Sequence, residues 1–96
     1  MKLKDYLLTC LSEESGEITQ AACKSLRFGL LDSRPGSDTT NWVDLRNEVH
    51  DLVAVYEMLC YEFDRVETLD RGLIDAKKVK VERYMAVSER LGRLIP

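Results

Sequence analysis

The stretch LKDYLLTCLSEESGEITQAACKSLRF, residues 3–28, decides the fold. One stripe of its apolar residues follows steps of four and three, or sums of these steps, as on the buried face of a helix. Its members are Leu3, Leu7, Cys10, Ala21 and Phe28. The stretch contains no proline, and the residue after it, Gly29, is typical of a helix stop. We therefore predict one long helix over residues 3–28.

The same helical periodicity continues after a segment rich in turn formers, residues 30–40, in which Pro35-Gly36 is the strongest turn signal. A second helix is predicted from Asn41, expected as its N-cap, to about Phe63, with the acid Asp44 favouring its start. Its apolar stripe is Leu45, Val49, Leu52, Tyr56, Leu59 and Phe63. A break is expected around residues 64–68. A third helix is predicted over about residues 69–91, with Gly92 as its stop.

The fold class that follows is all-α, an antiparallel helical bundle with three main helices per chain. With 96 residues, the chain is expected to be a single domain, residues 1–96. A chain this small buries proportionally little of its surface, and three long helices leave much apolar surface uncovered. We therefore expect a homodimer or homotetramer to complete the bundle.

Composition narrows the function classes. Hydrophobic residues make up 45% and charged residues 32%, as in globular proteins. The formal net charge of −3 argues against a nucleic-acid polymer as partner. No apolar run is long enough to span a membrane, and Asp5 interrupts any signal-peptide core, so a cytoplasmic location is expected.

The three cysteines, Cys10, Cys23 and Cys60, show no CxxC spacing and lie among apolar neighbours. Buried structural thiols in a reducing compartment are expected, rather than a zinc site.

Charge is divided unevenly along the chain. Residues 68–93 carry seven Lys/Arg against four Asp/Glu, net +3, whereas residues 1–67 carry seven against thirteen, net −6. The third predicted helix is therefore the basic part of the molecule.

Charged residues interrupt the inward stripe of the first predicted helix. Continued in steps of four and three, this stripe includes Glu14, Glu17 and Lys24. In the second helix Glu48 and Asp51 lie beside the apolar stripe. Each acidic pair is three residues apart, which places both side chains on one helix face.

If the two helices pack antiparallel, the four carboxylates can converge on one point. Their mutual repulsion would be costly without a divalent cation, and an oxygen-only ligand set favours Mg²⁺, Mn²⁺ or Ca²⁺ over zinc. The alternative is a pair of ordinary solvated acidic faces, since the chain has 17 Asp and Glu residues. Gly16 costs about 1 kcal/mol relative to alanine within a helix, which indicates close approach by another helix or by a ligand.

The segments Glu13-Glu14-Ser15-Gly16-Glu17 and Glu48-Val49-His50-Asp51 resemble the EExxE…ExxD signature of the MazG-like all-α nucleotide pyrophosphohydrolases. This group includes dimeric dUTPases, dCTP pyrophosphatases and phosphoribosyl-ATP pyrophosphohydrolases. Residues 24–29 and 75–84 also resemble segments of small single-domain MazG-like proteins from phages and bacteria. The resemblance spans residues 13–84. One departure is the separation of Glu17 from Glu48 by thirty residues (48 − 17 − 1), long for the family, which leaves the shape of the substrate pocket open.

The resemblance implies hydrolysis of a nucleoside triphosphate between its α and β phosphates, giving a monophosphate and pyrophosphate. Mg²⁺ is the implied cofactor, with Mn²⁺ as a substitute. The role would be house-cleaning of the nucleotide pool, or phage control of host nucleotides or alarmones. The implied metal ligands are Glu14, Glu17, Glu48 and Asp51, and Glu13 is the candidate catalytic residue that orients or deprotonates the attacking water. Five basic residues are candidates for binding the substrate's phosphates: Lys24, Arg27, Lys77, Lys80 and Arg83.

Two other function classes stay open. One is a non-catalytic helical dimer that uses its charged faces to bind a protein partner. The other is a structural protein stabilised by a metal without turnover.

Overall fold

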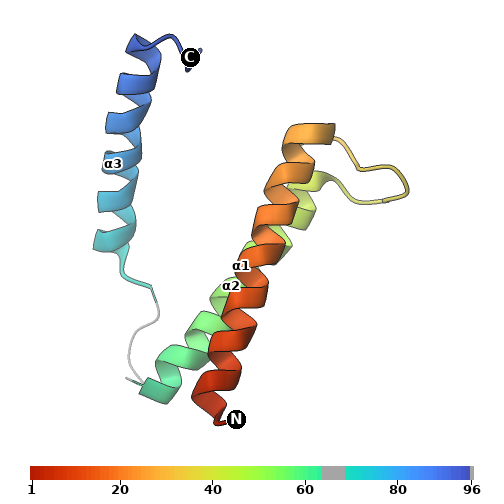
Figure 1. Ribbon diagram of the computed structural model, residues 1–96, viewed down its shortest axis with the longest axis vertical. Coiled ribbons are helices and arrows are strands. Elements are labelled where there is room, and N and C mark those ends of the chain that lie inside the picture. Colours follow the sequence, from red (N-terminus) through yellow and green to blue (C-terminus); the bar gives the residue numbers. More distant parts are fainter. Residues whose placement is uncertain (64–68, 96) are drawn as a thin grey trace. The chain divides into compact units, whose positions relative to one another are not determined.

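The computed structural model describes residues 1–63 and 69–95 (Figure 1). Three α-helices follow one another in the order α1 (Leu3–Phe28), α2 (Asn41–Phe63) and α3 (Arg71–Arg90), and the described residues contain no strand. The all-α prediction is confirmed. The chain divides into two compact units, Met1–Val66 and Glu67–Pro96, which are described separately below. That residues 1–96 work as one domain stays a prediction.

Helix α1 has the bounds that its sequence predicts. It ends at Gly29, whose φ of +97° lies in the left-handed region and whose N–H donates to the carbonyl of Ser25 over 2.9 Å. Glycine adopts this conformation without the steric penalty of a Cβ atom. The periodic face of the helix contributes the two buried apolar side chains of the described residues, Leu7 and Ala21.

Helices α1 and α2 pack side by side as an antiparallel hairpin, joined by the loop over residues 30–40 (Figure 1). At the open end of the hairpin the Lys4 ammonium lies 4.8 Å from the ring centroid of Phe63. At the closed end the Asn41 N–H donates to the carbonyl of Asp32 and the Trp42 N–H to that of Leu30, each over 2.8 Å. These bonds fix where α2 begins relative to the end of α1.

The predicted N-cap of α2 is wrong by one residue. The hydroxyl of Thr40, not the side chain of Asn41, accepts the N–H of Val43 over 3.2 Å. The Asn41 amide instead turns inward and donates to the carbonyl of Gly29 over 2.8 Å, and only 1% of its surface is exposed. The Asn41 side chain therefore binds the carbonyl of Gly29 at the end of α1 and does not cap α2.

Replacing Gly29 by alanine should destabilise the hairpin by about 1–3 kcal/mol, because the positive φ is strained for any residue with a Cβ. The new Cβ would also lie 2.6 Å from Asp32 Oδ2, which would have to move. Chemical denaturation followed by circular dichroism measures the change. The matched control is Gly16→Ala in the middle of α1, where a Cβ meets nothing within 4 Å and should stabilise the protein by about 0.5–1 kcal/mol. Equal effects of the two substitutions would contradict this account of the hairpin end.

Helix α3 begins at Arg71, two residues after the predicted start, because the Asp70 side chain caps it by accepting the N–H of Leu73 over 3.1 Å. It ends at Arg90, one residue before the predicted end, and the predicted stop Gly92 follows two residues later. Gly92 has a φ of +73°, and the Arg93 N–H donates back to the carbonyl of Ser88 over 2.8 Å. The break predicted around residues 64–68 lies outside the described residues.

The hairpin leaves a large part of its apolar surface exposed. The exposed large apolar residues of α1 and α2 are Leu3, Tyr6, Leu8, Leu26, Trp42, Val49, Tyr56, Met58, Tyr61 and Phe63. This is the uncovered surface from which self-association is predicted, and the association itself stays a prediction. None of the described helices is long and apolar enough to cross a membrane.

The three cysteines are free, as expected. Cys10 and Cys60 are half-buried, whereas Cys23 is exposed, so the expectation of buried thiols is wrong for Cys23. That residue lies on the side of α1 away from the buried stripe.

Candidate functional site

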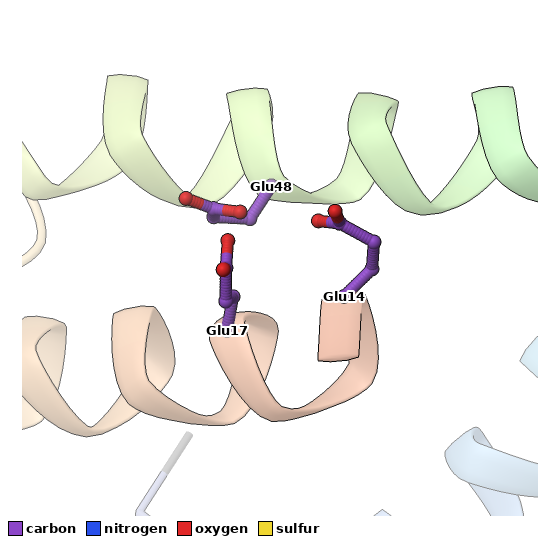
Figure 2. Close-up of side chains that lie close together, drawn as sticks. All are labelled: Glu14, Glu17 and Glu48. Atoms are coloured by element: carbon purple, nitrogen blue, oxygen red, sulfur yellow. The ribbon is translucent and has the colours of Figure 1, made fainter. Parts of the chain in front are cut away.

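Three glutamate side chains converge between the two helices of the hairpin (Figure 2). Glu14 and Glu17 extend from α1 toward α2, and Glu48 lies on the facing side of α2. One carboxylate oxygen from each residue lies within 4.8 Å of the others. We call these three residues the glutamate cluster. Three of the four carboxylates that are expected to converge thus do so, because the i,i+3 spacing on α1 and the antiparallel hairpin are both present.

The glutamate cluster is held at the packed face of the helices. It lies along α1 between the buried residues Leu7 and Ala21. Glu14 and Glu48 are half-buried, and Glu17 is exposed. Glu14 Oε2 and Glu48 Oε2 are buried and have no hydrogen-bond partner. A buried acceptor without a donor costs free energy, so each of these oxygens requires a proton, a water molecule or a cation as its partner.

Burial and the proximity of like charges raise the pKa of two members of the cluster, Glu14 and Glu48. Burial raises the pKa of Glu14, and the charges of Glu17, Asp51 and Glu13 act in the same direction. Once protonated, Glu48 can hydrogen-bond to Glu17, and this bond raises the pKa of Glu48 to about 7, helped by burial and by the charges of Glu17, Asp51 and Glu14. Without a cation, the cluster therefore retains a proton close to neutral pH.

This pKa predicts how the stability of the metal-free protein depends on pH. The folded chain holds the Glu48 proton up to about pH 7, whereas an unfolded chain releases it near the ordinary value of 4.5. The folded state thus binds more protons between these two values, so its stability falls as the pH rises from about 4.5 to 7.

Urea denaturation in EDTA at pH 5 and pH 7.5 measures this effect. Glu48→Gln, which cannot titrate, should lose less stability over the same interval than the unsubstituted protein. An identical pH dependence in the two proteins would contradict the shared-proton account.

Asp51, the fourth predicted metal ligand, is exposed and is not one of the three residues whose oxygens converge. Its charge nevertheless reaches the cluster, since it raises the pKa of both Glu14 and Glu48. The structure thus places Asp51 beside the cluster, and its role as a ligand stays a prediction.

Glu13 and Gly16 are sequence neighbours of the glutamate cluster on α1: Glu13 precedes Glu14, and Gly16 precedes Glu17. Glu13 is exposed, and its charge contributes to the raised pKa of Glu14. Its role toward an attacking water stays a prediction. The close approach expected at Gly16 is not made by the described residues, because a Cβ there would meet nothing within 4 Å. The surface at Gly16 is open to a ligand or to a second chain.

A pocket of about 250 Å³ lies beside the cluster and extends toward the closed end of the hairpin. Glu17 and Glu48 line one end, which the pocket shares with the cluster. The other lining residues come from α1, the loop and α2: Gln20, Ala21, Lys24, Arg34, Asn41, Asp44 and Asn47. Lys24 thus lines the pocket, and its contact with substrate stays a prediction. Arg34 is missing from the prediction, because it lies in a loop where periodicity carries no signal.

The other predicted cations differ in their surroundings. Arg27 is exposed in the last turn of α1, with its guanidinium carbon 5.4 Å from the centroid of the Phe28 ring, and it does not line the pocket. Lys77, Lys80 and Arg83 are exposed on α3, in the second unit, at the three-residue spacing that places them in one row. A contact of these four residues with substrate stays a prediction.

No protein-family model matches the chain, and neither a curated protein nor a solved structure shows significant similarity to it.

Proposed function

We propose that the chain is a Mg²⁺-dependent nucleotide pyrophosphohydrolase of the MazG-like type, which hydrolyses a nucleoside triphosphate to a monophosphate and pyrophosphate. The observation that carries the proposal is the glutamate cluster, in which carboxylate oxygens from two helices lie within 4.8 Å of one another. The EExxE…ExxD resemblance supplies the reaction, and it assigns Glu14, Glu17, Glu48 and Asp51 to the metal.

The donor set fits the proposed metal. All three groups are carboxylates, and Mg²⁺ and Mn²⁺ prefer oxygen ligands. Two of the oxygens, Glu14 Oε2 and Glu48 Oε2, are buried without a partner, so a cation would satisfy both and offset the repulsion within the cluster. Mg²⁺ binds proteins through few carboxylates and completes its coordination with water and substrate phosphates, which suits a cluster with one exposed member.

When bound, Mg²⁺ would neutralise the charge of the phosphates and stabilise the charge that develops during cleavage. In the proposed step Glu13 takes a proton from water while the water oxygen bonds to the α phosphorus. The bond from that phosphorus to the α–β bridging oxygen breaks, and the electron pair leaves with pyrophosphate. Lys24, in the neighbouring pocket, contributes positive charge to the departing phosphates.

We also propose that the enzyme acts in the cytoplasm as a homodimer or homotetramer. The exposed apolar residues along α1 and α2 support self-association, because a second hairpin packed on them would complete a four-helix bundle. Nucleotides, rather than nucleic-acid polymers, are the proposed ligands.

Product analysis by anion-exchange chromatography tests the reaction. The protein is incubated with each common NTP and dNTP, and with guanosine tetraphosphate, in Mg²⁺ or Mn²⁺. Equal amounts of monophosphate and pyrophosphate from at least one triphosphate are expected. A diphosphate with inorganic phosphate would contradict cleavage between the α and β phosphates. No product from any nucleotide would favour a partner-binding helical dimer or a metal-stabilised structural protein.

A further inference from the structure

The charge of the residues that line the pocket beside the glutamate cluster changes along the pocket. Glu17 and Glu48 line the end that coincides with the cluster. Two cations, Lys24 and Arg34, line the same pocket from the last turns of α1 and from the loop. A ligand that extends from the cluster into the pocket therefore passes from proposed metal ligands to positive charge.

Neither cation is neutralised within the described part of the chain. The Lys24 ammonium and the Arg34 guanidinium make no ion pair or hydrogen bond there, although three carboxylates line the same pocket. The third carboxylate, that of Asp44, is occupied otherwise, since its Oδ1 accepts the Thr39 hydroxyl over 2.7 Å. If a metal takes Glu17 and Glu48, the remaining lining charge is positive, at two cations against one carboxylate.

A second unsatisfied group lies in the same wall. Asn41 is 1% exposed, and its amide nitrogen is committed to the carbonyl of Gly29. Its Oδ1 is buried and has no partner, so it requires a donor. Lysine and arginine side chains donate only. Lys24 and Arg34 line the same pocket as Asn41 and carry the donors of that lining with the highest charge.

We propose that this pocket is a diphosphate subsite, in which Arg34 and Lys24 hold the two phosphates that leave as pyrophosphate. The inference rests on the proposed function for the identity of the substrate, but it assigns a new residue, Arg34, and a direction. The α phosphate lies over the glutamate cluster, the β and γ phosphates lie toward the loop, and the nucleoside projects out of the pocket. Base selectivity is then set outside this pocket.

The competing occupant of the pocket is the nucleobase. Three carboxamides in the lining, those of Gln20, Asn41 and Asn47, could bond to a base edge. A neutral base, however, would bring no counter-charge to the two cations as it displaced their water, which is costly. A diphosphate matches them, because the fork of an arginine pairs with phosphate oxygens.

Isothermal titration calorimetry with two probes separates these occupants. Magnesium pyrophosphate and the nucleoside monophosphates AMP and dUMP are each titrated into the protein in saturating Mg²⁺. The variants are Arg34→Ala and Arg34→Lys. The control is Arg46→Ala, which removes an exposed arginine of α2 that does not line the pocket. The Arg34 side chain has no structural partner among the described residues, so its replacement should leave the fold intact.

Arg34→Ala should raise the dissociation constant of magnesium pyrophosphate about tenfold, with partial recovery in Arg34→Lys. It should leave monophosphate binding unchanged, and Arg46→Ala should change neither. Unchanged pyrophosphate binding in Arg34→Ala would overturn the subsite, as would weaker monophosphate binding alone, which would assign the pocket to the nucleoside.

These readouts do not require turnover. An inactive protein that meets them retains the subsite and refutes the proposed function, whereas an active enzyme that fails them retains the function and refutes the subsite.

Discussion

Replacing Glu48 by glutamine is expected to lower kcat/KM for pyrophosphate release by at least about 100-fold. The substitution keeps the size of the side chain but removes one negative charge from the glutamate cluster, together with an oxygen that has no other partner. A metal ion contributes several kcal/mol to charge stabilisation in the transition state, and each factor of ten in rate corresponds to about 1.4 kcal/mol. A steady-state pyrophosphate assay at saturating Mg²⁺ measures the loss.

The matched control for this variant is Glu57→Gln. Glu57 lies on the same helix, is exposed and does not belong to the glutamate cluster. Its replacement removes the same charge from α2 without touching the proposed metal site and should leave the rate unchanged. A Glu48→Gln enzyme with the full rate, or a comparable loss in Glu57→Gln, would remove the cluster from the mechanism.

Mg²⁺ is expected to raise the melting temperature of the protein, because a ligand that binds only the folded state stabilises it by mass action. At ten times its dissociation constant the contribution is about 1.4 kcal/mol. For a chain of this size that corresponds to an increase of roughly 6–11 °C. Melting is followed by circular dichroism at pH 8, in EDTA and in Mg²⁺, with the ionic strength held constant.

The Glu48→Gln protein should differ from the unsubstituted protein both in EDTA and in its response to Mg²⁺. In EDTA it should melt above the unsubstituted protein, since one of three like charges has been removed from a confined space. Its melting temperature should change little when Mg²⁺ is added. An equal Mg²⁺ shift in both proteins would show that the cation acts elsewhere on the acidic surface.

The sequence is sufficient to predict the helices, because they depend on local periodicity. It also predicts the glutamate cluster, because the cluster needs only the spacing on each helix and a hairpin connection between the two helices. The bounds of α1 follow from an uninterrupted helical pattern that ends at Gly29. The meeting of Glu14 and Glu17 with Glu48 follows from the i,i+3 spacing on one helix and the hairpin connection to the next.

What the sequence could not supply depends on contacts between distant residues. Thr40 and Asn41 are both good N-caps, and the choice between them is made by the carbonyl of Gly29, which binds the Asn41 amide. Arg34 lies in a segment without periodicity, so only the folded loop shows that it lines the pocket. The distance of Asp51 from the converging oxygens likewise depends on the register at which α1 and α2 pack.

The most direct test of the central claim is the initial rate of pyrophosphate release from an equimolar mixture of the common NTPs and dNTPs, measured as Mg²⁺ is titrated from an EDTA-treated state. The account predicts no release in EDTA and a rate that rises and saturates with Mg²⁺. Release that persists in EDTA, or no release at any Mg²⁺ concentration, would contradict it.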